Sequence, residues 1–292
     1  MTPEEPALFQ LHEPEPPEPL HPWIRFLVSA VFVVIANYLA LIPIFVLFSR
    51  HPLLADALYR SIVVAILIAG FFAFSRFVDR REDHVWTYIG LPGGQSSFRQ
   101  FLTGVAIGGV LIAVGVAAIA LLGGYSISAQ LSATALRHEL LVLVLLLAGA
   151  MAEEVAFRGY PFQRLVEAAG PWVAVAVMSA VFAAIHLGNP NAGGLMSWGF
   201  VNTILVGALF AYAYLRTRTL WLPFGMHFGW NFFLGVVFGL PVSGIRDFSI
   251  LVRSSAHGPK LLTGGSYGLE ASLTGAVVIG LGFLLVAWAP KP

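Results

Sequence analysis

Eight apolar stretches occupy most of the sequence, and each is close to the length that a helix needs to cross a bilayer. A spanning helix takes about 20 largely apolar residues. Because backbone groups without hydrogen-bond partners are costly in hydrocarbon, such stretches are expected to be helical. We therefore predict an all-α fold, a polytopic integral membrane bundle of about eight transmembrane helices. The predicted spans cover residues 23–48, 58–78, 99–123, 139–158, 172–188, 198–215, 220–239 and 271–289.

The composition excludes most classes of soluble protein. Charged residues make up 11% and hydrophobic residues 58% of the 292 residues, whereas a soluble globular chain carries roughly 25% charged residues. The net charge of +1 attracts no polyanion, so we expect no nucleic-acid partner. The absence of cysteine excludes disulfides, thiolate catalysis and cysteine-based metal sites. The expected partners are the lipid bilayer and a membrane-associated protein or peptide substrate, and the sequence does not define an oligomeric state.

The chain divides into a short tail and one membrane domain. Residues 1–22 are rich in proline and glutamate and contain no lysine or arginine, which predicts a disordered acidic tail. Residues 23–292 form a single predicted transmembrane domain. With the N-terminus inside, ten basic residues lie on the inner side and six on the outer side. This bias predicts a multi-pass protein with both termini in the cytoplasm, and we expect it in the cytoplasmic membrane of a prokaryote.

Two adjacent carboxylates lie near the end of the fourth predicted span. An ionisable residue at a membrane helix centre costs roughly 2.5–3.5 kcal/mol, so Glu153 and Glu154 are functional candidates. Glu154 and Arg158 are four residues apart and share a helix face on which they can pair. Arg158 would hold Glu154 ionised and leave Glu153 available for proton transfer. The alternative interpretation is a helix end whose charges lie among lipid headgroups.

Two later spans carry polar side chains at helical spacing. His186 follows Phe182 by one turn, near the end of an apolar span. Taken alone, His186 is more typical of a structural histidine with one partner. His227 and Asn231 are also one turn apart, and both can donate hydrogen bonds to a developing oxyanion. The alternative for this pair is polar contact between neighbouring helices.

Together, these three motifs resemble the CPBP family, the CAAX proteases and bacteriocin-processing enzymes that include the type II CAAX prenyl endopeptidase. The resemblance covers a catalytic core of about residues 139–235. The motifs that carry it are Glu153-Glu154-Val155-Ala156-Phe157-Arg158, Phe182-Ala183-Ala184-Ile185-His186 and Leu220-Trp221-Leu222-Pro223-Phe224-Gly225-Met226-His227-Phe228-Gly229-Trp230-Asn231.

The resemblance implies an intramembrane endopeptidase that hydrolyses a peptide bond in a cavity open to the cytoplasm. It implies that Glu153 is the general base and that His186 helps to hold the attacking water. It also implies that His227 and Asn231 stabilise the oxyanion. The candidates for supporting roles are Glu154, Arg158 and Phe182.

The metal requirement has two interpretations at this stage. We favour hydrolysis without a cofactor, in which Glu153 activates water. The alternative is a zinc site formed by Glu153, His186 and His227, because carboxylate and imidazole groups are common zinc ligands. No carboxylate partner for the two histidines is evident from the sequence.

Two different functions also fit the same residues. One is an ion- or proton-coupled transporter, in which the carboxylates and histidines form an ion path. The other is a non-catalytic member of the same family that acts as an immunity or scaffold protein.

Other patterns give expectations about packing and solvation. We expect interior ionisable residues only in the second half of the chain, and we expect the charged loop at residues 76–83 to be solvated. The pairs Gly104/Gly108 and Gly235/Gly239 predict close helix packing, because small residues let helix backbones approach one another.

Overall fold

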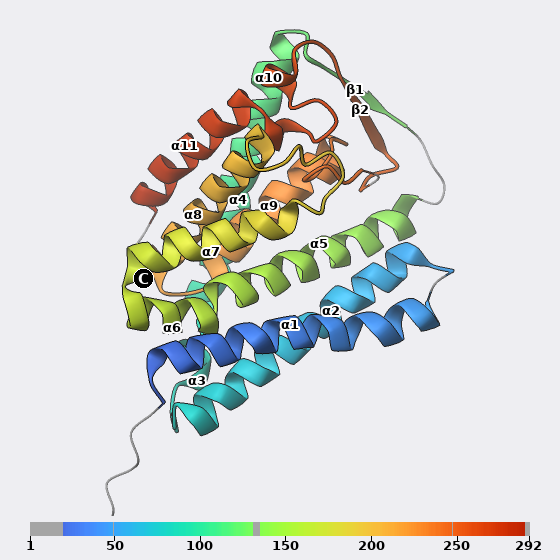
Figure 1. Ribbon diagram of the computed structural model, residues 1–292. Helices are drawn as coiled ribbons and strands as arrows, with labels where there is room; N and C mark the ends of the chain where they lie inside the picture. Colours follow the sequence, from blue (N-terminus) through green and yellow to red (C-terminus); the bar gives the residue numbers. More distant parts are fainter. Residues whose placement is uncertain (1–19, 49, 131–134, 247, 290–292) are drawn as a thin grey trace, which may run out of the picture.

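The computed structural model describes residues 20–48, 50–130, 135–246 and 248–289 (Figure 1). The predicted acidic tail, residues 1–22, lies outside the described residues except for its last three. The helices are α1 (Pro22–Leu47), α2 (Pro52–Ala73), α3 (Val85–Tyr88), α4 (Gln95–Leu121), α5 (Ala135–Arg158), α6 (Tyr160–Ala169), α7 (Pro171–His186), α8 (Trp198–Thr217), α9 (Trp221–Phe232), α10 (Lys260–Thr263) and α11 (Leu273–Trp288). Short π-helical segments, Phe74–Val78 and Phe233–Val237, extend α2 and α9, and a 3₁₀ turn, Leu269–Ala271, precedes α11.

The helical membrane fold predicted from the sequence is confirmed. Each of the eight predicted spans coincides with a helix. Within the described residues, five helical stretches are long and apolar enough to cross a membrane: α1, α2 with its π-helical extension, α4, α5 continued by α6, and α8. The apolar helices α7 and α11 are shorter, at 16 residues each, and α9 has 12 residues before its π-helical extension.

Local sequence signals start several of these helices. Pro22, Pro52 and Pro171 occupy the first helical position of α1, α2 and α7, where the missing N–H has no intrahelical partner to lose. Ser197 caps α8 by accepting a hydrogen bond from the backbone N–H of Phe200 at 3.1 Å. A serine at the N-cap of α11 does the same for that helix.

The bundle consists of two halves that meet at the middle of the molecule. One buried core joins α1, α2, α5, α6 and α7 with part of α8, and a second joins α4, α8, α9 and α11. A third, smaller core connects α5 to α9 through residues such as Leu146, Ala150, Phe224 and Phe228. Figure 1 shows α5 and α7 running beside the junction between the halves. The predicted catalytic helices α5, α7 and α9 therefore come from both halves.

Glycines bring the backbones of α4 and α9 into close contact. A Cβ atom on Gly104 would lie 2.3 Å from the carbonyl oxygen of Leu222, and one on Gly108 would lie 2.3 Å from that of Met226. In the other direction, a Cβ on Gly225 would lie 2.1 Å from a carbonyl of α4. These distances are shorter than any real Cβ contact, so the prediction of close helix packing at Gly104 and Gly108 is confirmed.

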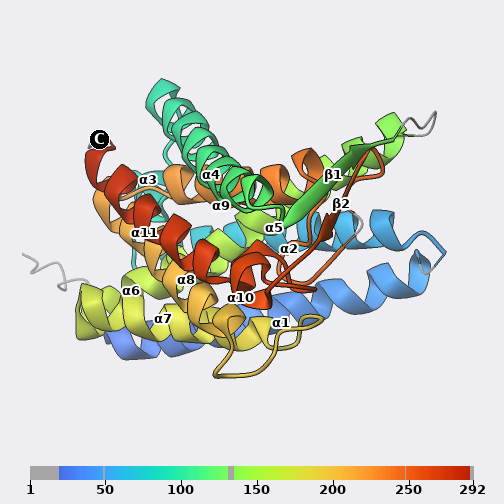
Figure 2. The same cartoon turned by 90° about the horizontal axis from the view of Figure 1, so that it is seen from above.

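A two-stranded antiparallel sheet was not expected from the sequence. It pairs β1 (Tyr125–Ala129) with β2 (Val252–Ala256), and Figure 2 shows it at the end of the molecule opposite to the C marker. The backbone of β2 also accounts for the packing of Gly239, the second residue of the Gly235/Gly239 pair. Gly239 has a φ of +59° and approaches the carbonyl oxygen of Val252, so it packs against a strand and the prediction of helix packing there is wrong.

A buried cluster of charges ties α1 and α6 to the segment after α2. Asp79 forms ion pairs with Arg25 at 2.7 Å and with Arg164 at 3.5 Å. Glu167 forms ion pairs with the same two arginines at 3.1 Å and 2.8 Å. The Asp79 side chain is only 2% exposed, so the expectation that the whole loop at 76–83 is solvated is wrong for this residue. Two carboxylates and two guanidinium groups balance each other here, which makes the burial of Arg25, Arg164 and Asp79 tolerable, while Glu167 stays partly exposed.

Filling the contact between α4 and α9 should destabilise the protein. We expect Gly108→Ala to lower the free energy of unfolding by about 1–3 kcal/mol, because a methyl group has no space against the α9 backbone. Thermal unfolding in detergent measures this loss. The matched control is Gly280→Ala in α11, since a Cβ at Gly280 meets no atom within 4 Å. Equal unfolding temperatures for the two variants would contradict this account of the interface.

Candidate active site

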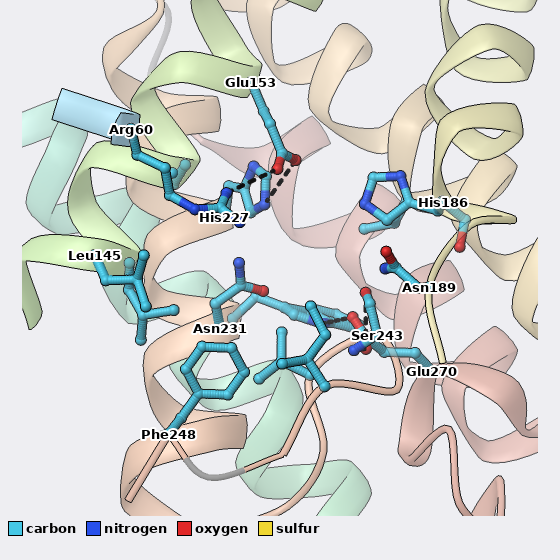
Figure 3. A pocket seen from close by; sticks show the side chains of 18 of the residues that line it. Arg60, Leu145, Glu153, His186, Asn189, His227, Asn231, Ser243, Phe248 and Glu270 are labelled. Carbon is cyan, nitrogen blue, oxygen red and sulfur yellow. Dashed lines mark hydrogen bonds and ion pairs between the residues drawn. The ribbon is translucent and has the colours of Figure 1, made fainter. Parts of the chain in front are cut away.

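A cavity of about 610 Å³ lies where the two halves of the bundle meet. Side chains from α2, α5, α7, α8 and α9 form its walls, and the chain around Ser243 and Glu270 closes it (Figure 3). All four residues predicted to be catalytic line this cavity, although they are spread over 79 positions of the chain. They are Glu153, His186, His227 and Asn231.

The cavity extends toward the end of the bundle that lies away from both described termini. Its lining includes Pro52 at the start of α2, His138 near the start of α5 and Asn189 just after α7. Pro22 begins α1 and Trp288 ends α11 at the opposite end of the bundle. The predictions of cytoplasmic termini and of a cavity open to the cytoplasm both stay predictions.

Glu153 lies on α5 with its carboxylate in the cavity. Its side chain is 26% exposed, and its Oε1 lies 3.7 Å from Nη1 of Arg60. Its Oε2 lies 3.7 Å from Nε2 of His227. Both distances are too long for a direct hydrogen bond, and Oε2 is a buried oxygen that has no hydrogen-bond partner among the described residues. The carboxylate thus faces two nitrogen groups and keeps one oxygen free for a further donor.

Glu154 faces away from the cavity and hydrogen-bonds two residues that support the site. It is fully buried, and its Oε1 accepts hydrogen bonds from Nη1 of Arg158 at 3.2 Å and from Nδ1 of His227 at 2.8 Å. Arg158 also donates to the carbonyl oxygen of Gly207 on α8 at 2.9 Å. The predicted pairing of Glu154 with Arg158 is confirmed. The carboxylate partner of His227, which the sequence analysis did not find, is Glu154.

Aromatic rings fix the position of the His227 imidazole. The ring of Phe210 stacks on it at 5.0 Å between centroids, and the ring of Phe182 meets it edge to face at 6.3 Å. The guanidinium carbon of Arg158 lies 4.7 Å from the centroid of Phe182. The Glu154 carboxylate accepts a hydrogen bond from Nδ1–H of His227. The Nε2 atom of the same ring therefore faces the cavity, where it is available for interactions.

His186 reaches the cavity from the last turn of α7. Its Nδ1 lies 2.7 Å from the carbonyl oxygen of Phe182. A carbonyl oxygen only accepts, so Nδ1 carries the proton and donates it, and Nε2 remains free. Asn231 lies one turn after His227 on α9, and Figure 3 shows its amide below the His227 ring on the cavity side. The structure therefore gathers both polar motifs around Glu153, while the roles of these residues stay predictions.

The arrangement does not provide a ready metal site. Among the described residues, no three His, Asp or Glu side chains lie close enough together to hold a metal ion. The three zinc-ligand candidates, Glu153, His186 and His227, all line the cavity, but their only contact with one another is the pair between Glu153 and His227 at 3.7 Å. The expectation of hydrolysis without a cofactor stays a prediction.

Four charged residues that line the cavity were missed by the sequence analysis: Asp56, Arg60, Arg246 and Glu270. Arg60 lies in α2, so the expectation that interior ionisable residues occur only in the second half is wrong. Arg60 lies inside the second predicted span, at residues 58–78, and this position could have identified it. The orientation count placed it instead among the six basic residues of the outer side. Glu270 lies just before α11, where nothing in the local pattern distinguishes it from an exposed loop residue.

Glu270 joins the floor of the cavity to α9. Its carboxylate accepts hydrogen bonds from Nε1 of Trp230 at 2.9 Å, from Oγ of Ser243 at 3.2 Å and from the backbone N–H of Ser243. Burial raises the pKa of the Glu270 carboxyl above its usual range, and the hydrogen bonds from Ser243 and Trp230 oppose that rise. Since Trp230 precedes Asn231, this carboxylate also steadies the helix turn that carries the amide.

Comparison with known proteins agrees with the motifs. Residues 135–233 match a family model described as Rce1-like, type II CAAX prenyl endopeptidase Rce1-like. The matched segment runs from the start of α5 to the end of α9 and includes every predicted site residue. The resemblance to the CAAX proteases is thus confirmed over about a third of the chain, which carries an Rce1-like domain. No curated protein and no solved structure matches the sequence.

Glu154→Gln should destabilise the fold strongly. The substitution leaves Arg158 buried without its ion-pair partner, a loss of about 3–5 kcal/mol in comparable buried pairs. Thermal unfolding in detergent checks this, with Glu82→Gln on the exposed loop as the control. If both variants unfold like the wild type, Glu154 does not organise this part of the bundle.

Proposed function

We propose that the protein is an intramembrane endopeptidase that hydrolyses a peptide bond of a membrane-associated protein or peptide. The observation that carries this proposal is the free Oε2 atom of Glu153, which faces Nε2 of His227 inside a cavity of a membrane bundle. A carboxylate with a free oxygen next to a held imidazole is suited to take a proton from water. The Rce1-like domain supports the same general activity.

The proposed reaction begins with a water molecule beside Glu153. Glu153 Oε2 takes one proton from the water as its oxygen attacks the carbonyl carbon of the scissile bond. His186, with Nε2 free, accepts a hydrogen bond from the same water and orients it. The carbon–nitrogen bond then breaks, and the proton held by Glu153 passes to the leaving amine. No other reactant is needed, because water supplies both the hydroxyl group and the proton.

The oxyanion of the tetrahedral intermediate needs hydrogen-bond donors. In its doubly protonated form, His227 donates from Nδ1 to Glu154 and from Nε2 into the cavity. The amide of Asn231 supplies a second donor one turn further along α9. Donors that are already held in place stabilise developing charge strongly, because they do not reorient during the reaction. Glu154, Arg158 and Phe182 act by holding these donors.

The side of the membrane follows from the position of the cavity. Among the described residues, the buried Arg25, Arg158 and Arg164 are left aside and Arg60 is assigned to the cavity wall; six basic residues near the end where α1 begins and α11 ends then compare with five at the cavity end. This excess favours that end as the cytoplasmic one. The cavity then opens on the opposite face of the membrane, and substrate reaches it from there.

Removing the proposed base or its partner should abolish cleavage. We expect Glu153→Ala and His186→Ala to lower kcat/KM for a quenched fluorogenic peptide by about 100-fold or more, while the protein still accumulates in the membrane. The control is His257→Ala, because His257 is exposed and hydrogen-bonded to Ser126 rather than to the site. Cleavage by purified Glu153→Ala at the wild-type rate would overturn the proposed mechanism.

The same preparation separates the alternatives. Stoichiometric zinc, with cleavage lost to a chelator and restored by zinc, would assign Glu153, His186 and His227 to a metal site. Transport coupled to an ion gradient, without peptide products, would support a transporter. Biological function retained by Glu153→Ala would support a non-catalytic immunity or scaffold protein.

Cysteine labelling tests the proposed orientation, since the natural chain contains no cysteine. Ser255→Cys lies on β2 at the cavity end, and Glu82→Cys lies on the loop at the other end. We expect a membrane-impermeant maleimide to label the first variant in intact cells and the second only after permeabilisation. The reverse pattern would place the cavity on the cytoplasmic face.

A further inference from the structure

Helix α2 contributes an arginine to the site from outside the segment that matches the family model. The Nε atom of Arg60 pairs with Oδ1 of Asp56 at 3.2 Å, one turn earlier on the same helix. Its Nη1 atom faces Oε1 of Glu153 on α5 at 3.7 Å. The Arg60 side chain is 30% exposed and lines the cavity, as Figure 3 shows. Asp56 therefore orients one edge of the guanidinium group and leaves the other edge for Glu153.

A glycine on α5 makes room for this arginine. Gly149 precedes Glu153 by four residues, so both lie on the same face of the helix. A Cβ atom on Gly149 would lie 3.0 Å from Nη1 of Arg60 and 3.3 Å from its Cδ. Because Gly149 has no side chain, the guanidinium group can lie against α5 one turn before Glu153.

These contacts extend the site into a chain of alternating charges across three helices. The order is Asp56, Arg60, Glu153, His227, Glu154 and Arg158, with adjacent contacts of 3.2, 3.7, 3.7, 2.8 and 3.2 Å. In this row, Glu153 and Glu154 each lie between two nitrogen-bearing side chains, and Asp56 is at one end. Because α2 supplies the charges at one end, Glu153 is held between groups from α2 and α9.

We propose that Arg60 is a positioning residue for Glu153, with Asp56 and Gly149 setting the place of its guanidinium group. The inference rests on the proposed peptidase function. Arg60 keeps Oε1 of the carboxylate engaged from the α2 side, so that Oε2 stays turned toward His227 and the water. Without Arg60, the carboxylate would turn freely and would meet the water less often in the reactive geometry.

Substitution at Arg60 tests the proposal against a merely structural role. We expect Arg60→Gln to lower kcat by about tenfold or more with little change in KM, since orientation acts on the chemical step. Arg60→Lys should retain an intermediate rate, because lysine keeps the charge but cannot engage both carboxylates through a planar group. The matched control is Arg137→Gln, on the exposed start of α5 and outside the cavity. Equal kcat for Arg60→Gln and the wild type would overturn the proposal.

Chemical rescue and the glycine give two further readouts. Millimolar guanidinium should raise the rate of Arg60→Ala and leave Arg137→Ala unchanged. Gly149→Ala should lower kcat in the same direction as Arg60→Gln, because its methyl group displaces the guanidinium end. No rescue, together with a wild-type kcat for Gly149→Ala, would contradict a positioning role.

A stability measurement keeps the inference testable apart from activity. If the wild type cleaves peptides and Glu153→Ala does not, but Arg60→Gln is normal, only the present proposal fails. If no variant cleaves, the contact itself is tested by a double-mutant cycle between Arg60→Met and Glu153→Gln in thermal unfolding. We expect the double variant to unfold at a higher temperature than the two single shifts predict together. Additive shifts would show that the two residues do not interact and would overturn the proposal.

Discussion

The structure depends on one buried interaction, the contact of the Glu154 carboxylate with Arg158 and His227. This carboxylate cannot be exposed to water, so its charge must be balanced by neighbours. Arg158 supplies the balance from the same helix, and His227 brings α9 against α5. The bond to Gly207 adds α8 to the same centre. One carboxylate therefore joins three helices and fixes the direction in which the His227 ring presents its free nitrogen.

Close packing of small residues makes this contact possible. Backbones of α4 and α9 touch at Gly104, Gly108 and Gly225, which anchors α9 in one half of the bundle. In the other half, Gly149 leaves room beside α5 for the Arg60 side chain. In a membrane, helices associate through such packing and through polar contacts rather than through the hydrophobic effect. The cavity is the space left where the two halves meet, and its polar groups are those that the packing brings together.

Much of the site could be predicted because helical spacing is a local property. Glu154 and Arg158, and likewise His227 and Asn231, are four residues apart, so their shared faces follow from the period of the α-helix. The pairing of His227 with Glu154 could not be predicted, since the two residues are 73 positions apart. Asp79 was misjudged because a charged loop is usually solvated, whereas Arg25 and Arg164 approach it only in the folded bundle. Glu270 lies in a glycine-rich segment with no periodic pattern.

The sequence by itself determined that the chain is a helical membrane protein, where its spans lie and which residues carry unusual charge. These properties follow from hydropathy and period, which each segment shows without its neighbours. Only the tertiary structure decided that Arg60 faces Glu153, that Glu154 holds His227 and that the cavity extends toward the end away from Pro22 and Trp288. The physical reason is that contacts between helices depend on how the helices pack against one another, which no single apolar segment encodes.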